Sequence, residues 1–183
     1  MEPWLCKLSI LTQMQSQFEL MEQILGKFPE TQSFDALHLD NKQRALSLLQ
    51  SNLRNQMSDL ADAFLGAFTD RLGYLKKVDT MDAHQEAESL LAEYNRVRPK
   101  VIFPLVKHGR KTNAFLIAEK YLDFSILAQL SLDDVNRESR IDDYMHRYSF
   151  DFARVLFSIY LEKGLLLMCT EIRNVQGVTG AKT

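Results

Sequence analysis

The chain has 183 residues, which is room for one domain with a buried core, because domains usually contain roughly 100–200 residues. Its 7 glycines and 4 prolines are too few for a many-stranded sandwich or barrel, which needs a turn about every ten residues. The hydrophobic fraction of 46% argues against disorder, and the net charge of −2 excludes a strongly basic nucleic-acid binder by bulk electrostatics, although not a local basic patch.

The first predicted helix runs from Trp4 to near Gly26, because apolar residues recur along it every three or four positions. Pro29 hinders its continuation, and the polar stretch 29–40 is predicted to be a loop. A second helix is expected to begin at Asp40 or Asn41, since either can cap it. Its predicted buried face has five members: Ala45, Leu48, Leu49, Leu53 and Met57.

The apolar stripe over 57–78 predicts a helix that continues the second one or follows it after a short break. Gly66 and Gly73 weaken it by about 1 kcal/mol each relative to alanine. The segment 79–82 supplies a break and a new N-cap.

The next helix is predicted to contain two prolines, Pro99 and Pro104, which should kink or break it. Gly109 is a suitable C-terminal stop. The apolar stripe of this helix has eight members: Ala87, Leu90, Leu91, Tyr94, Val97, Val101, Ile102 and Leu105.

Shorter helices follow, with Thr112 or Asn113, then Asp123, then Asn136 as their predicted caps. A last helix is expected to start at Ser149 or Asp151 and to end at Gly164. Apolar positions predicted for these helices are Phe115, Ile117, Ala118 and Tyr121, then Phe124, Ile126, Leu127 and Leu130, then Ile141, Tyr144, Met145 and Tyr148, and finally Phe150, Phe152, Ala153, Leu156, Phe157, Tyr160 and Leu161.

These elements predict an all-α fold, an irregular α-helical stack of antiparallel helices like a fragment of an α-solenoid. The expected organisation is one α-helical domain over 1–173, with long helices in 1–107 and short helix pairs in 112–164. The tail 174–183 lacks an apolar stripe and carries two glycines, so we expect it to be flexible.

No catalytic, cofactor or metal site is predicted, and partner-binding residues are not assigned. His38, His84, His108 and His146 show no metal-ligand spacing, and His146 with Asp142 is interpreted as a surface pair four residues apart. The doublets 133–134 and 142–143 are better explained as helix-start and surface charge than as paired catalytic carboxylates.

The basic stretch over 96–111 makes contact with nucleic acid or phosphate conceivable, although a solvated rim is the favoured interpretation. Cys6 and Cys169 cannot form a disulfide framework, so a reducing compartment is expected. No stretch has the ~20 apolar residues that span a bilayer, and the N-terminus is not predicted to be a secretory signal.

Two segments are more specific than a helical pattern. One is Ile-Ala-Glu-Lys-Tyr-Leu-Asp-Phe-Ser-Ile-Leu at 117–127, and the other runs from Arg-Ile-Asp-Asp-Tyr-Met at 140–145 to Phe-Ser-Ile-Tyr-Leu-Glu-Lys-Gly at 157–164. In order and spacing they resemble the C-terminal α-helical region of the 133-kilodalton nucleoporin family, and Pro-Leu-Val-Lys-His-Gly at 104–109 resembles the turn before it. The resemblance is strongest over 104–164 and faint over 1–103.

The resemblance implies a scaffold of the Y-shaped nuclear pore complex, located at the nuclear envelope, rather than an enzyme. It implies other nucleoporins of that complex as partners, without direct nucleic-acid contact or membrane insertion, and no cofactor. The family carries a β-propeller before its helices and binds the 107-kilodalton nucleoporin through its last helices, and both are expected to be missing from this chain. A helical adaptor or ligand-binding bundle unrelated to the pore is the alternative, and an all-α enzyme is a third, for which no constellation was found.

Overall fold

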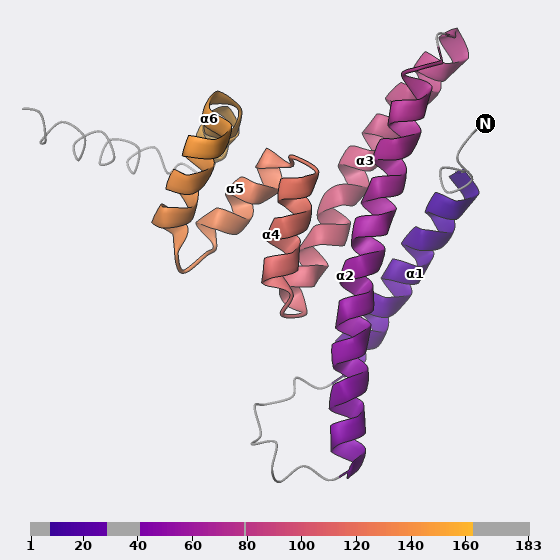
Figure 1. Cartoon of the computed structure of the whole chain (residues 1–183), viewed down its shortest axis with the longest axis vertical. Helices are drawn as coiled ribbons and strands as arrows, with labels where there is room; N and C mark the ends of the chain where they lie inside the picture. Colours follow the sequence, from indigo (N-terminus) through magenta and orange to yellow (C-terminus); the bar gives the residue numbers. More distant parts are fainter. Residues whose placement is uncertain (1–7, 29–40, 79, 163–183) are drawn as a thin grey trace, which may run out of the picture. The chain divides into compact units, whose positions relative to one another are not determined.

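The computed structural model describes residues 8–28, 41–78 and 80–162. Of these residues 89% are helical, and this part of the chain contains six helices and no strand (Figure 1). The predicted all-α class is therefore confirmed. The predicted loop over 29–40, the stop at Gly164 and the tail 174–183 lie outside the described residues. The helices are α1 (Leu8–Lys27), α2 (Asn41–Leu75), α3 (Met81–Lys107), α4 (Lys111–Lys120), α5 (Phe124–Leu132) and α6 (Arg137–Glu162).

The helices group into two compact units, Met1–Ile117 and Ala118–Thr183. In the first unit α2 packs against both α1 and α3, and the three helices alternate in direction (Figure 1). In the second unit α5 packs against α6. The antiparallel neighbours are as predicted, while the single domain over 1–173 remains a prediction.

The core of the first unit is built from the middle of α2 and the second half of α3. Phe64 is fully buried and meets Phe68 edge to face, with ring centroids 5.1 Å apart, and Phe68 lies 5.6 Å from the ring of Tyr94 on α3. Such ring pairs add to the burial of their apolar area. α1 contributes every seventh residue to this core, namely Leu11, Phe18 and Leu25.

The start of α2 is exposed, which contradicts the predicted buried face of this helix. Met57 is buried as predicted, but Leu48 is 64% exposed, Leu49 is 54% exposed and Ala45 is also exposed. Two reasons account for this: Leu48 lies about 180° around the helix from Met57, and the first turns of α2 extend beyond the ends of α1 and α3 (Figure 1). The two stripes predicted on either side of Met57 belong to one helix of 35 residues, without a break.

Pro99 and Pro104 were expected to kink or break this helix; both lie inside α3, so a break does not occur. A proline in a helix interior costs about 3 kcal/mol. The buried residues on both sides of Pro99, such as Val97, Val101 and Ile102, each contribute about 1.5–3 kcal/mol on burial, which outweighs this cost. Leu91, assigned to the buried stripe, is 48% exposed.

The ends of α3 are defined by the residues that the sequence indicated. Thr80, within the predicted break, is the N-cap, and its hydroxyl accepts a hydrogen bond from the amide of Ala83 at 3.3 Å. Gly109 has φ of +76°, and the amides of Gly109 and Arg110 donate to the carbonyls of Val106 and Leu105. This is a Schellman motif, and it confirms Gly109 as the stop. α4 then begins at Lys111, so the caps predicted at Thr112 or Asn113 are wrong.

A second turn of the same kind joins α4 to α5, but its left-handed position is occupied by Leu122. Leu122 has φ of +50°, its amide donates to the carbonyl of Glu119, and the amide of Asp123 donates to the carbonyl of Ala118. Asp123 is the N-cap of α5, as predicted, and its carboxylate accepts from the amide of Ile126 at 3.2 Å. One residue therefore closes α4 and opens α5.

Leu122→Gly is expected to stabilise the chain by about 0.5–1 kcal/mol. The left-handed conformation costs a non-glycine residue about 1–2 kcal/mol, and the greater freedom of glycine in the unfolded chain offsets roughly half of that gain. Leu116→Gly is the matched control, because Leu116 is 59% exposed, against 57% for Leu122, but lies inside α4. The control should destabilise by about 1 kcal/mol. Urea denaturation measures both, and the same sign for the two variants would contradict the strain at Leu122.

Helix α6 consists of two helices that meet at a kink at Ser149, where the dihedral angles are non-helical (φ 45°, ψ −119°), so the predicted start of a last helix at Ser149 is confirmed. Helix α6 begins directly after the predicted cap Asn136. Tyr144, Phe152 and Leu156 are buried as predicted. Three residues assigned to the same apolar set are exposed instead: Phe150, Phe157 and Leu161.

Candidate interaction surface

A polar cluster in the second unit joins the end of α4 to α6. The hydroxyl of Tyr144, a fully buried residue, donates to Oε1 of Glu119 at 2.5 Å. Burial raises the pKa of Tyr144, and the hydrogen bond to Glu119 raises this pKa further, so the phenol keeps its proton and remains a donor. Nη1 of Arg147 lies 3.5 Å from Oε2 of Glu119, and its Nε donates to Oδ2 of Asp143 at 3.0 Å. The cluster thus holds the two helices together.

Sequence reasoning did not find this cluster. Glu119 and Tyr144 are 25 positions apart, and no helical spacing relates them. The buried position of Tyr144 was predicted, and a buried phenol needs a hydrogen-bond partner. That requirement is the one signal in the sequence that could have prompted a search for an acceptor.

The acidic doublets and His146 form local pairs. Asp133 is the C-cap of α5, and Oδ2 of Asp134 accepts from Nε of Arg140 at 2.6 Å. Nδ1 of His146 lies 3.5 Å from Oδ1 of Asp142 in an exposed pair, which confirms the surface pair predicted there. These positions suit helix ends and surface ion pairs. That the chain has no catalytic or cofactor site stays a prediction.

The basic side chains of the stretch 96–111 contact several different partners within the chain. Nε of Arg96 donates to Glu93 at 2.8 Å, and the guanidinium of Arg98 lies 4.8 Å from the centroid of the Tyr94 ring. Nζ of Lys107 lies 3.6 Å from Glu22 on α1, and Nη2 of Arg110 donates to the carbonyl of Ser51 at 3.3 Å. This distribution favours the solvated rim over a dedicated phosphate-binding patch.

His108, the C-cap of α3, is the buried member of that stretch. Its Nε2 has no hydrogen-bond partner among the residues that the structure describes. Burial lowers the pKa of the imidazole below its ordinary value of 6.5, and the charge of Lys107 lowers this pKa further, while Glu22 acts in the opposite direction. The folded state therefore favours neutral His108.

The free energy of unfolding is expected to fall with acidification through His108. The unfolded chain binds a proton at this histidine near pH 6.5, before the folded chain does, so the stabilisation is complete above that pH and is lost as the pH falls toward the lower pKa of the folded state. His108→Gln removes the titration. Urea denaturation between about pH 5 and pH 8 should show a shallower fall for the variant than for the original chain. If the free energy of unfolding fell equally steeply with acidification in both proteins, the burial of His108 in its neutral form would be contradicted.

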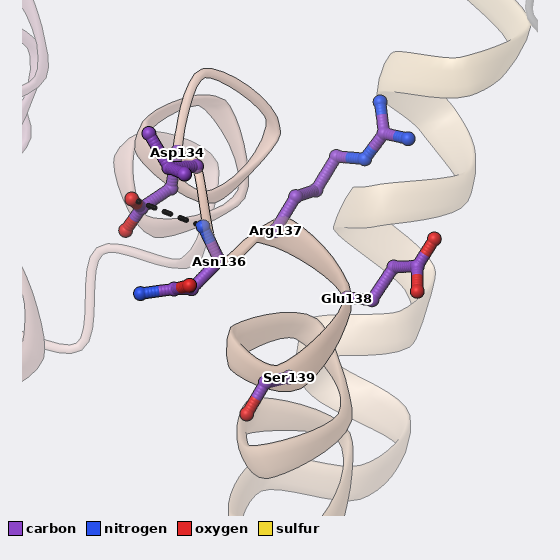
Figure 2. A pocket seen from close by; sticks show the side chains of 6 residues that line it. Asp134, Asn136, Arg137, Glu138 and Ser139 are labelled. Atoms are coloured by element: carbon purple, nitrogen blue, oxygen red, sulfur yellow. Dashed lines mark hydrogen bonds between the residues drawn. The ribbon is translucent and has the colours of Figure 1, made fainter.

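Figure 2 shows a depression in the turn that leads into α6. It is lined by one continuous run of residues, 134–139, and the amide of Asn136 donates to Oδ1 of Asp134 at 3.5 Å. Val135, in the middle of this run, is 97% exposed. A lining drawn from a single solvated turn lacks the buried, convergent polar groups that are typical of a ligand site.

In the part of the chain that the structure describes, no group of three or more His, Cys, Asp or Glu side chains could hold a metal ion. Searched over the same residues, no helix combines the length and the hydrophobicity that crossing a membrane requires.

Exposed apolar side chains are the feature that best suits contact with another segment or protein. On α6 they are Phe150, Phe157 and Leu161, which are 75%, 49% and 57% exposed and which we call the α6 stripe. Their spacing of seven and four residues places them along one side of the helix. Sequence analysis placed all three among the apolar positions of the last helix; the sign that it missed is that α6 carries apolar residues on two faces.

Comparison with known proteins gives one consistent set of relatives. The chain is 36% identical over 118 residues to Nuclear pore complex protein Nup133 of Homo sapiens, a match that covers 62% of this chain and 10% of the human protein. It is 31% identical over 161 residues to Nup133 of Mus musculus, covering 78% of this chain and 14% of the mouse protein. Nucleoporin nup132 of Schizosaccharomyces pombe is 23% identical over 171 residues, covering 90% of this chain and 14% of the yeast protein.

No protein-family profile matches the chain, and neither does any solved structure. The chain spans only about a tenth of the length of the curated relatives that it matches. The matched lengths exceed the span 104–164, so the similarity also includes residues outside the segment in which the sequence motifs are strongest. The chain thus corresponds to a partial region of the Nup133-like nucleoporins, which confirms the resemblance drawn from its motifs.

Proposed function

We propose that the chain acts as a structural scaffold component of the nuclear pore complex, at the nuclear envelope, through protein–protein contacts and without enzymatic activity. The observation that carries this proposal is the identity of 36% over 118 residues with a nuclear pore complex protein. The expected partners are other nucleoporins of the Y-shaped complex. A contribution to mRNA export and protein import follows indirectly, because transport depends on an assembled pore.

The helical structure of the chain supports a structural role. Its described part is helical and carries buried cores in both units, with ion pairs and capped helix ends fixing the turns. Helices that pack in sequence order keep most contacts local, so the outer faces of each unit can meet neighbours.

Proximity labelling tests the proposal. A labelling enzyme fused to the chain, expressed from the gene's own locus, should enrich nuclear pore proteins above a free labelling enzyme matched for expression level. A labelled set without pore proteins, but with one other consistent partner, would overturn the proposal in favour of a helical adaptor unrelated to the pore.

The isolated 183-residue chain, carrying a fluorescent tag, is expected to spread diffusely or to stain the nuclear rim only weakly. The reason is that the chain spans only about a tenth of the length of the relatives that it matches, so by itself it offers few of the contacts that a whole nucleoporin can make. Imaging against a pore marker measures the rim-to-cytoplasm ratio. Strong rim staining would show that residues 1–164 hold a partner surface of their own.

A further inference from the structure

Three side chains at the junction of α2 with the turn after α3 have buried nitrogen atoms without a hydrogen-bond partner among the described residues. These atoms are Nε of Arg54 on α2, Nε2 of His108 at the end of α3 and Nε of Arg110 in the turn. Nη2 of Arg110 donates to the carbonyl of Ser51, which lies about one helical turn before Arg54. Burial lowers the pKa of His108 and the charges of Lys107 and Arg54 lower it further, so Arg54 lies near the imidazole.

The two guanidinium groups carry positive charge that is not neutralised locally. Among the described residues, neither Arg54 nor Arg110 forms an ion pair with a carboxylate. Glu22 acts on His108, but it lies 3.6 Å from Nζ of Lys107 and is compensated by that charge. His108 is only 8% exposed, whereas both arginines are half-buried, so a small ligand can reach them from the solvent.

A ligand for this junction has to accept hydrogen bonds and to carry negative charge. A buried N–H group without an acceptor destabilises the folded state, and an oxyanion supplies both the acceptor and the counter-charge. Donors on two helix ends and a turn suit a phosphate monoester, whose three terminal oxygens accept from several directions. A carboxylate has two oxygens in one plane and is matched by a single arginine fork. Clusters of arginine are a common means of recognising phosphorylated segments.

A nucleic acid suits the junction less well. Its backbone requires several cations in a row, each near a different phosphate. The basic residues that precede the junction contact carboxylates of the chain instead, since Arg96 donates to Glu93 and Lys107 lies beside Glu22. The junction therefore uses only the end of the basic stretch 96–111 and adds Arg54 from another helix, which gives room for one phosphate rather than a track.

We infer that Arg54, His108 and Arg110 form a binding site for one phosphate monoester, presented by a phosphorylated serine or threonine of a partner protein. Neutral His108 donates through Nε2–H, and the two guanidinium groups supply the counter-charge. The inference deepens the proposed function, because it names the chemistry by which a partner of the scaffold is recognised. Its test uses the isolated chain without pore components, so its failure leaves the scaffold proposal standing, and a failed proximity labelling leaves this site standing.

Nuclear magnetic resonance titration of the full-length chain tests the site. The probe is the N-acetyl amide of phosphoserine, added at constant ionic strength and at about pH 7.5, where His108 is neutral. The imidazole signals of His108 should shift and reach saturation. Acetate, the carboxylate probe, should bind at least about tenfold more weakly, and the N-acetyl amide of unphosphorylated serine should cause no shift.

Arg54→Gln should weaken the binding of the phosphoserine probe by about tenfold or more, the factor expected when a hydrogen bond to a charged group is lost. Arg44→Gln is the matched control. Arg44 is an exposed residue of the same helix, and its replacement changes the net charge by the same amount. The control should bind the probe within about twofold of the original chain, as an exposed charge outside the site contributes little. Both variants are first checked by circular dichroism for unchanged helical content.

Four results would overturn the site. They are a titration that does not saturate, acetate binding as tight as that of the phosphoserine probe, equal weakening by Arg54→Gln and Arg44→Gln, and a His108 signal that stays unchanged while others shift. A short single-stranded RNA that binds more tightly than the phosphoserine probe, and that loses affinity in the Arg54→Gln variant, would assign the site to nucleic acid instead.

Discussion

Phe64→Ala is expected to lower the free energy of unfolding of the first unit by about 3–5 kcal/mol, the range for deleting a large aromatic side chain from a core. Phe64 is fully buried in the middle of α2, and its ring meets that of Phe68 edge to face at 5.1 Å. The substitution removes both the buried area and the ring pair, and the surrounding helices cannot collapse fully into the space. Urea denaturation followed by circular dichroism measures the loss.

Leu48→Ala on the same helix is the control for that experiment. Leu48 is 64% exposed, although the helical pattern alone assigned it to the buried face of α2. Its replacement should change the free energy of unfolding by about 0.5 kcal/mol or less, as at an ordinary surface site. A loss comparable to that of Phe64→Ala would mean that the first turns of α2 are covered in solution, and would restore the sequence-based assignment.

Leu127→Ala is expected to destabilise the second unit by about 2–5 kcal/mol. Leu127 is completely buried on α5, beside Ile126 and Leu130, which are each 3% exposed. α5 has 9 residues, and a helix this short depends on packing rather than on intrinsic propensity. Amide exchange of α5 measures the effect directly, because it reports on this unit without requiring that the whole chain unfold in one step.

Ser125→Ala is the matched control on α5. Ser125 is exposed and lies on the face opposite Leu127, so its replacement should change the stability by about 0.5 kcal/mol or less. Equal effects of the two substitutions would contradict the assigned buried face. A neutral Leu127→Ala that weakened the binding of a partner would instead make this face an open interface.

The sequence by itself was sufficient for the features that depend on neighbouring residues. The cap at Asp123, the stop at Gly109 and the break near Thr80 were all predicted close to where they occur, because each is decided by the backbone preferences of one or two residues. The all-α class followed from helical spacing, and the relation to nucleoporins from two short motifs. These features can be recognised in a single sequence because none of them depends on contacts between distant residues.

The tertiary structure decided which apolar residues are covered. Leu48 and Phe64 both lie on α2, but about 160° apart around its axis, and the neighbouring helices cover the face that carries Phe64 and leave Leu48 exposed. Pro99 remains inside α3 because burial on both sides of it outweighs the lost hydrogen bond. The contact between Tyr144 and Glu119, and the exposure of the α6 stripe, likewise depend on how helices meet across many residues. Helical periodicity predicts that a side chain belongs to an apolar face, but whether another element covers that face is determined by packing between elements.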